Sequence, residues 1–122
     1  EIIAVLGETR VQHYSVGEHF HYPADAARFL AELPELVDSF AGCDVLLYQA
    51  GADPHIDDPL GGWLSTEDLF RRDYMIFQQC RRHGIPVAWN LAGGYQKPLR
   101  KVLDIHDNTL RAARIVWSRA TA

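Results

Sequence analysis

Cysteine is scarce in this sequence of 122 residues, which contains only Cys43 and Cys80. Two cysteines are too few for a disulfide framework, and neither has a Cys or His neighbour at the spacing of a zinc finger. The N-terminal residues also lack the basic flank and cleavage pattern of a secretory leader. We therefore expect both thiols to be reduced and the protein to be cytoplasmic.

Long apolar runs are absent as well, since no stretch approaches the roughly 18 consecutive apolar residues that a membrane-spanning helix needs. The sequence has no internal repeat, low-complexity segment or linker, and 48% of its residues are hydrophobic. We therefore expect residues 1–122 to form one domain that does not bind a membrane. No G-x-G-x-x-G or P-loop signature is present, which argues against a nucleotide-binding domain.

Charge is distributed unevenly along the chain. Residues 1–61 carry eleven acidic and two basic residues, whereas residues 62–122 carry five acidic and ten basic residues. Two solvated faces would explain this distribution, and so would acidic groups gathered near a metal or a cationic substrate. The pairs Arg71-Arg72 and Arg81-Arg82 are predicted to face solvent on one helix, and nothing indicates nucleic-acid binding.

Hydrophobic periodicity predicts an α/β fold in which strands and helices alternate. We expect a three-layer α/β/α arrangement around a small, mostly parallel sheet of about three strands. Pro34 is expected to kink or split the first long helix, whereas Ser65 and Asp68 form a capping box at the start of the next. The expected elements are a helix tail over residues 1–6, strands over 10–16, 44–50 and 86–91, and helices over 23–40, 65–84 and from Pro98 onward.

Two of these helices have recognisable apolar faces. The face of the helix over residues 65–84 carries Leu69, Phe70, Asp73, Ile76, Phe77 and Cys80. The stripe of the last helix carries Leu99, Val102, Leu103, His106, Leu110, Ala113 and Trp117.

Polar side chains follow two of the predicted strands where each strand ends. Asp53 comes after the strand over 44–50, and Tyr95 comes after the strand over 86–91. Ligand sites in open α/β sheets lie at such strand ends, a carboxylate can bind a metal, and a tyrosine can donate a hydrogen bond to an oxyanion. Asp53 as a turn residue and Tyr95 as an amphipathic residue at a helix entrance remain open alternatives.

The residues around these two positions resemble a known family. The stretch Gln49-Ala50-Gly51-Ala52-Asp53-Pro54-His55-Ile56-Asp57-Asp58-Pro59-Leu60-Gly61-Gly62, followed by Leu91-Ala92-Gly93-Gly94-Tyr95, resembles the C-terminal half of the histone deacetylase superfamily. This superfamily includes the acetylpolyamine amidohydrolases and the acetoin-utilisation proteins. The resemblance covers residues 40–115 well and implies part of a three-layer, arginase-like fold.

The resemblance also implies roles for individual residues. Asp53 matches the last zinc ligand, and Tyr95 matches the catalytic tyrosine that polarises the acetyl carbonyl. Gly93 and Gly94 match the glycine-rich wall of the acyl pocket. The residues that match the turn supporting the ligand loop are Asp58, Pro59 and Gly61. From their place in the chain, His55 in the acidic loop and Phe20 between His19 and His21 are further candidates for lining the substrate pocket near its mouth, and a solvated loop position is the alternative for His55.

Other parts of the family pattern are missing from this sequence. The family needs an Asp-x-His pair that supplies two more zinc ligands and a His-His pair that acts as general base. Asp53-Pro54-His55 has the first spacing but lies in the later loop, and His19-Phe20-His21 is not an adjacent pair. We therefore expect a fragment of a zinc-dependent amidohydrolase for acetyl-lysine or acetylpolyamine substrates, which alone is inactive and holds no zinc stably.

A second hypothesis from the sequence is a non-catalytic α/β module. Such a module would keep the fold without the complete site and would oligomerise through the surface left by the missing half. The expected partner is therefore either another copy of the chain or an N-terminal half.

Overall fold

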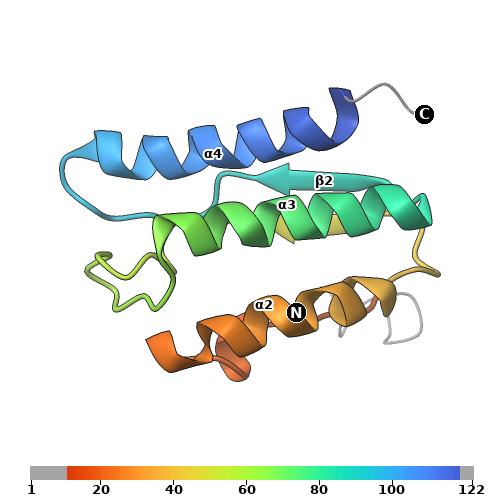
Figure 1. Cartoon of the computed structure of the whole chain (residues 1–122), viewed down its shortest axis with the longest axis horizontal. Coiled ribbons are helices and arrows are strands. Elements are labelled where there is room, and N and C mark those ends of the chain that lie inside the picture. The colour runs from red at the N-terminus through yellow and green to blue at the C-terminus, as the bar shows by residue number, and fades with distance from the viewer. Residues whose placement is uncertain (1–10, 119–122) are drawn as a thin grey trace.

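The computed structural model describes residues 11–118, which form an α/β structure (Figure 1). The helix tail expected over residues 1–6 lies outside this range. The α/β class and the small parallel sheet predicted from the sequence are confirmed. The elements in chain order are the 3₁₀ turns η1 (Val16–Glu18) and η2 (Pro23–Asp25), then α2 (Ala26–Asp38), β1 (Leu46–Gln49), α3 (Thr66–His83), β2 (Val87–Asn90) and α4 (Leu99–Ser118).

The sheet consists of β1 and β2, which are parallel and joined through α3. Leu46 pairs with Val87 at one end of the strands, and Gln49 pairs with Asn90 at the other. Parallel neighbours need such a long crossover because the end of the first strand and the start of the second lie at opposite ends of the sheet. The two strands therefore finish side by side, which brings the segments that follow them together.

The third strand expected over residues 10–16 is wrong for its described part. Residues 11–15 are irregular, and Val16 begins η1. The side-chain amide of Gln12 donates to the carbonyl of Ser39 at 3.0 Å, which ties this segment to the end of α2. Tyr14 stacks on His19 with 4.8 Å between ring centroids, so its ring packs locally. These local contacts replace strand pairing.

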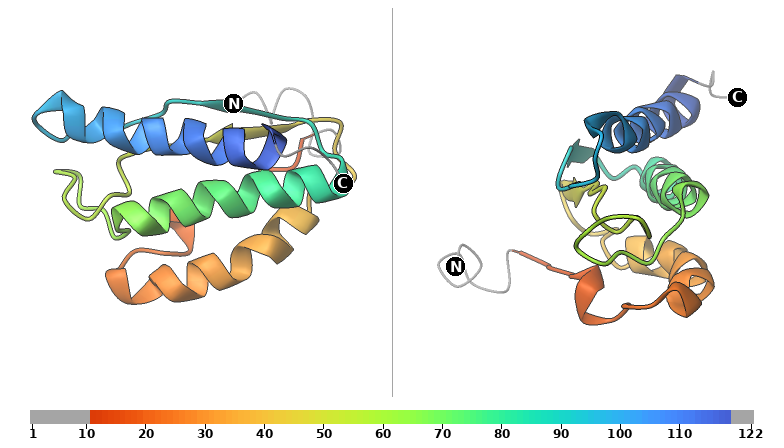
Figure 2. Two further views of the ribbon diagram at one scale, coloured as in Figure 1. Left: turned by 45° about the horizontal axis from the view of Figure 1, so that its top comes forward. Right: turned by 90° about the vertical axis from the view of Figure 1, so that its left-hand side faces the viewer.

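The three helices lie side by side against one face of the sheet, with α3 in the middle (Figure 2). In the part of the chain described here, no second helical layer covers the opposite face. Apolar side chains on that side are exposed, with exposed fractions of 49% for Val45 and 78% for Leu47. Side chains alternate between the faces of a strand, so Leu47 points away from the helices that bury Leu46.

Helix α3 begins and ends where the sequence predicts. The Oγ of Ser65 accepts a hydrogen bond from the Asp68 amide at 3.0 Å, and the Asp68 carboxylate accepts one from the Ser65 amide at 3.1 Å. This reciprocal pair satisfies two backbone donors at the helix start. At the other end, Gly84 has a φ of 66°, the left-handed conformation that glycine adopts most easily.

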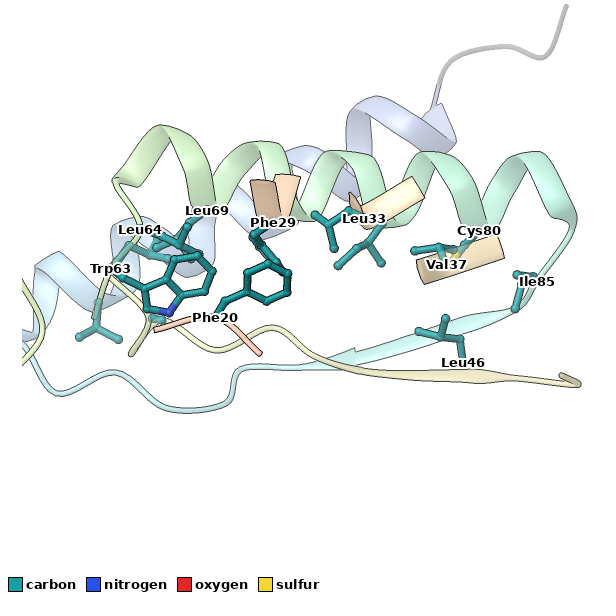
Figure 3. Packing of buried hydrophobic residues seen from close by; sticks show 14 residues of the cluster. Phe20, Phe29, Leu33, Val37, Leu46, Trp63, Leu64, Leu69, Cys80 and Ile85 are labelled. Carbon is teal, nitrogen blue, oxygen red and sulfur yellow. The ribbon is translucent and has the colours of Figure 1, made fainter. Parts of the chain in front are cut away.

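Helix α3 separates two hydrophobic clusters. On one side, its residues pack with Phe29, Leu33 and Val37 of α2 and with Leu46 of β1 (Figure 3). On the other side, the fully buried Phe77 packs against Ala112, Ala113 and Val116 of α4. Because both neighbouring helices depend on it, α3 is the central element of the core.

Pro34 does not split α2, which is continuous from Ala26 to Asp38. Proline has no backbone N–H to donate a helical hydrogen bond, which normally weakens a helix interior. Here Phe29, Leu33 and Val37 are each at most 3% exposed and hold the helix against the core on both sides of the proline. Tertiary packing therefore outweighs the local penalty.

The buried face of α4 is rotated from the predicted stripe. Val102, His106 and Ala113 are buried as expected. The exposed fraction, however, is 65% for Leu99, 37% for Leu103, 62% for Leu110 and 43% for Trp117. The residues that complete the buried face are Ile105, Thr109, Ala112 and Val116. Across residues 11–118, no helix is both long and apolar enough to cross a lipid bilayer.

Candidate functional site

The ends of β1 and β2 bring Asp53 close to Gly93. Pairing continues past the strands, since the Ala52 amide donates to the Ala92 carbonyl at 3.0 Å. Asp53 and Gly93 each come one residue later. The two strand exits that carry the expected site residues therefore form one continuous surface, as the sequence predicts for neighbouring parallel strands.

Glycine is required where the Asp53 carboxylate lies over the second exit. A Cβ added to Gly93 would lie 2.0 Å from the Asp53 Oδ1, and one added to Gly51 would lie 2.7 Å from the same oxygen. Gly93 also has a φ of 63°, which disfavours other residues. A Cβ on Gly94 would lie 2.6 Å from Val102 Cγ1. The two exits can approach this closely only because these side chains are absent.

Asp58 connects the loop after Asp53 to the backbone of Tyr95. The Asp58 side chain is buried, and one of its oxygens accepts from the Leu60 amide at 2.9 Å. The other oxygen accepts from the Tyr95 amide at 2.9 Å. The Asp58 carbonyl accepts from the Gly61 amide at 3.0 Å, and Gly61 has a φ of 83°. Asp58 therefore fixes the loop turn and Tyr95 together.

Tyr95 lies at the surface, with 54% of its side chain exposed. Its hydroxyl has no hydrogen-bond partner among residues 11–118. Tyr95 borders a hollow of about 420 Å³. The residues that line the hollow are Asp57, Pro59, Tyr95, Gln96, Lys97 and Lys101. A free phenol at the edge of a hollow is available to donate a hydrogen bond to a ligand.

The sequence of this chain is similar to those of known proteins. The family model for the histone deacetylase domain matches residues 6–111. The chain belongs to the histone deacetylase family. An uncharacterized protein of Picosynechococcus sp. is 37% identical to it over 75 residues, which cover 61% of this chain and 25% of that protein. The matched stretch therefore spans only a quarter of the relative.

Members of the histone deacetylase family are generally zinc-dependent, and the described residues do not complete a zinc site. No group of three His, Cys, Asp or Glu side chains within residues 11–118 could hold a metal ion. A catalytic zinc needs three protein ligands. Asp53 is half-buried and could contribute one carboxylate, but the other ligands would have to come from elsewhere.

The structure places His55 inside the loop and not on the hollow. His55 is 8% exposed. Its Nδ1 accepts a hydrogen bond from the Asp57 amide at 3.0 Å, and its Nε2 lies 2.8 Å from the Thr66 hydroxyl. Because Nδ1 is an acceptor, Nε2 carries the proton and donates to Thr66. Both ring nitrogens are therefore engaged in joining the loop to the start of α3.

The structure places Phe20 in the hydrophobic core. Phe20 is 2% exposed and stacks on Trp63, with 6.0 Å between ring centroids. Phe29 contacts it edge-on at 5.2 Å (Figure 3). The hollow beside Tyr95 does not include Phe20. An aromatic between two histidines looks like a site residue in sequence, but here it anchors η1 and η2 to the core.

The expectation that Arg72 faces solvent is wrong. Its side chain is 6% exposed, and its Nε donates to the Asp73 carboxylate at 2.9 Å. Its Nη1 donates to the carbonyl of Gly51 at 2.9 Å. Sequence contained a signal for this burial, because Arg72 lies three residues after Leu69 and four before Ile76 and thus shares their helix face.

Asp73 connects this arginine to two further elements. Tyr48 of β1 donates its hydroxyl to Asp73, and Thr109 of α4 donates to the other Asp73 oxygen at 2.5 Å. Burial raises the pKa of Tyr48 well above its ordinary value, and Asp73 raises it further. Burial opposes the charge of Arg72, but Tyr48 and Asp73 outweigh it and raise the Arg72 pKa. The network is therefore a neutral tyrosine around one buried ion pair.

We predict that Arg72→Ala strongly destabilises the chain. The substitution leaves the Asp73 carboxylate buried without its cation, which costs about 3–5 kcal/mol. Urea denaturation followed by circular dichroism measures this loss. Arg71→Ala is the matched control, because Arg71 is the exposed neighbour with 61% of its side chain exposed. The control should change stability by less than about 0.5 kcal/mol. Equal effects of the two variants would contradict the prediction.

We also predict that Gly93→Ala costs more stability than Gly61→Ala. Both glycines have a positive φ, but a Cβ on Gly61 would meet no atom within 4 Å. Both substitutions therefore carry backbone strain of about 1–2 kcal/mol. Gly93→Ala must also displace Asp53, which adds about 1–3 kcal/mol. Urea denaturation gives the difference, and a shift of the Asp53 ¹³Cγ resonance only in Gly93→Ala shows its origin. Unfolding free energies that match within error would exclude the contact.

Proposed function

We propose that this chain supplies part of the active site of a zinc-dependent amidohydrolase that removes acetyl groups from amines. The observation that supports this best is the packing of the Asp53 carboxylate on Gly93, two residues before Tyr95. In this proposal Asp53 is one zinc ligand of a larger set, and Tyr95 acts on the acetyl carbonyl. The substrate is an acetylated amine of the acetyl-lysine or acetylpolyamine class.

Tyr95 has the chemistry that amide hydrolysis requires. When water adds to the acetyl carbonyl carbon, negative charge develops on the carbonyl oxygen. A phenol that donates a hydrogen bond to this oxygen stabilises the charge more in the transition state than in the bound substrate. The C–N bond then breaks, the amine leaves with a proton and acetate is released. Asp58 supports this role by holding the Tyr95 amide at 2.9 Å.

Gly93 and Gly94 would form the wall beside the acetyl group. Their backbone is accessible to a ligand because neither residue carries a side chain. Asp58, Pro59 and Gly61 would support the loop that carries Asp53. These roles are consistent with the short contacts of Asp58 and with the position of Pro59 on the hollow beside Tyr95.

The proposal requires protein groups beyond those in residues 11–118. Further zinc ligands and a general base to activate water must come from another segment or another chain. The bare face of the sheet around Val45 and Leu47 is where such a partner would dock, because exposed apolar patches of this kind mark protein contacts. We therefore propose an N-terminal half of the same enzyme as the partner.

We predict that Tyr95→Phe abolishes most activity when the chain is joined to such a half. In a polypeptide where an Asp-x-His segment of a family member precedes this chain, kcat for an acetyl-lysine reporter should fall about 10²–10³-fold, with little change in KM. Tyr22→Phe is the matched control, because Tyr22 is 68% exposed and does not border the hollow. The isolated chain should give no turnover. If the isolated chain hydrolysed the reporter and Tyr95→Phe removed this activity, the proposal that the site needs groups from a second half would be contradicted.

The second candidate is a non-catalytic module that oligomerises, and the observation in its favour is the same bare face. Leu47 of β1 is 78% exposed. We predict that the isolated chain self-associates at about 100 µM and that Leu47→Lys shifts it to monomer. Leu110→Lys on α4, where the side chain is 62% exposed, is the control. Sedimentation velocity measures the species present. A monomeric wild-type chain at this concentration would exclude the module hypothesis.

A further inference from the structure

The hollow beside Tyr95 has a polar group that no other part of the described chain satisfies. Gln96 borders the hollow and is 8% exposed. Its side-chain amide has no hydrogen-bond partner within residues 11–118. The fully buried side-chain atoms without a partner in the described chain are Arg72 Nη2 and His106 Nδ1, so the Gln96 amide still reaches solvent. An amide in this position is therefore well suited to donate to a ligand that enters the hollow.

The charges around the hollow favour an anion. Lys97 and Lys101 both border it, and neither forms an ion pair with another residue in the described range. Asp57 is the one acidic residue of the lining, and its carboxylate lies 4.0 Å from the Nδ1 of His55. The lining therefore carries two positive charges and one negative charge. The Arg100 side chain is occupied by Asp104 and Asp107.

Helix α4 adds to this preference. It begins at Leu99, between the two lysines in the sequence, and runs for twenty residues to Ser118. The N-terminal end of a helix carries a partial positive charge. Lys101 lies in the first turn, where its amide donates to the Pro98 carbonyl at 3.1 Å. Two ammonium groups, the amide of the largely buried Gln96 and a helix N-terminus are thus grouped at one place.

We propose that this hollow binds a carboxylate of the substrate. The proposal rests on the proposed function and narrows its substrate class to acetylated amines that also carry a free carboxylate, such as acetyl-lysine as a free amino acid. Carboxylates form charge-assisted hydrogen bonds with ammonium and amide donors. The same lining repels the cationic amines of an acetylpolyamine. Tyr95 borders the hollow, so the acetyl group and the carboxylate of one small molecule would lie at adjacent positions.

Ligand titration of the 122-residue chain followed by ¹H–¹⁵N NMR tests the proposal. The probes are 6-acetamidohexanoate, the neutral 6-acetamidohexanamide and the cationic N-acetylputrescine. The carboxylate should shift the backbone amides of residues 95–97 and 99–101 and the Gln96 side-chain amide. The two other probes should bind at least about tenfold more weakly. Binding of the neutral amide with the same affinity would overturn the proposal, as would the absence of shifts at about 50 mM carboxylate.

Variants identify the groups responsible. Lys97→Gln with Lys101→Gln should weaken carboxylate binding about tenfold, and Gln96→Leu should weaken it severalfold. Arg111→Gln with Arg114→Gln removes the same charge from exposed positions further along α4 and should change affinity less than about twofold. If both double variants weakened carboxylate binding equally, the effect would be due to net charge, and the proposed site would be wrong. Because binding is measured without zinc or turnover, this result is independent of whether the chain proves to be part of a deacetylase.

Discussion

The buried ion pair between Arg72 and Asp73 is the interaction on which the rest of this structure depends. A cation with 6% of its side chain exposed is tolerated only when its donors find acceptors. Here Nε meets the Asp73 carboxylate and Nη1 meets the Gly51 carbonyl, whereas Nη2 is buried without a partner in the part of the chain that the structure describes. Asp73 in turn accepts from Tyr48 and Thr109. One polar network therefore connects β1, α3 and α4 and holds the backbone two residues before Asp53.

This anchoring explains how two short strands can present a defined surface. A two-stranded sheet is marginal alone, but its exits are fixed from several sides. Arg72 holds Gly51, the Ala52 amide pairs with Ala92, and Asp58 holds the Tyr95 amide. The glycines let these fixed segments approach so closely that any side chain on Gly93 would overlap the Asp53 carboxylate. Precision at the strand exits comes from these connections and not from the strands themselves.

Local signals in the sequence predicted the helices and strands well, whereas they could not predict contacts between residues that are distant in sequence. The Ser65–Asp68 capping box and Gly84 fixed α3 because their effects are confined to neighbouring residues. The pairing of the two strand exits also followed from strand–helix alternation. Helix α4 is apolar on two sides, and periodicity could not decide between Leu110 and Thr109 as the buried residue. Arg72 was missed because its burial depends on Gly51 and Tyr48, which are distant in sequence. The strand over residues 10–16 failed because local contacts outweighed a weak alternation.

The bare sheet face and the incomplete ligand set have one explanation under the proposed function. A parallel sheet is normally covered on both faces, and here the side carrying Leu47 is exposed. A catalytic zinc needs ligands from several strand ends, and here two exits offer one carboxylate. A segment that added strands and helices on that side would bury the apolar face and bring further strand ends to the same edge. Such a segment would therefore contribute both stability and ligands. Without it, the sheet lacks a cover for its apolar face and the site lacks its further zinc ligands.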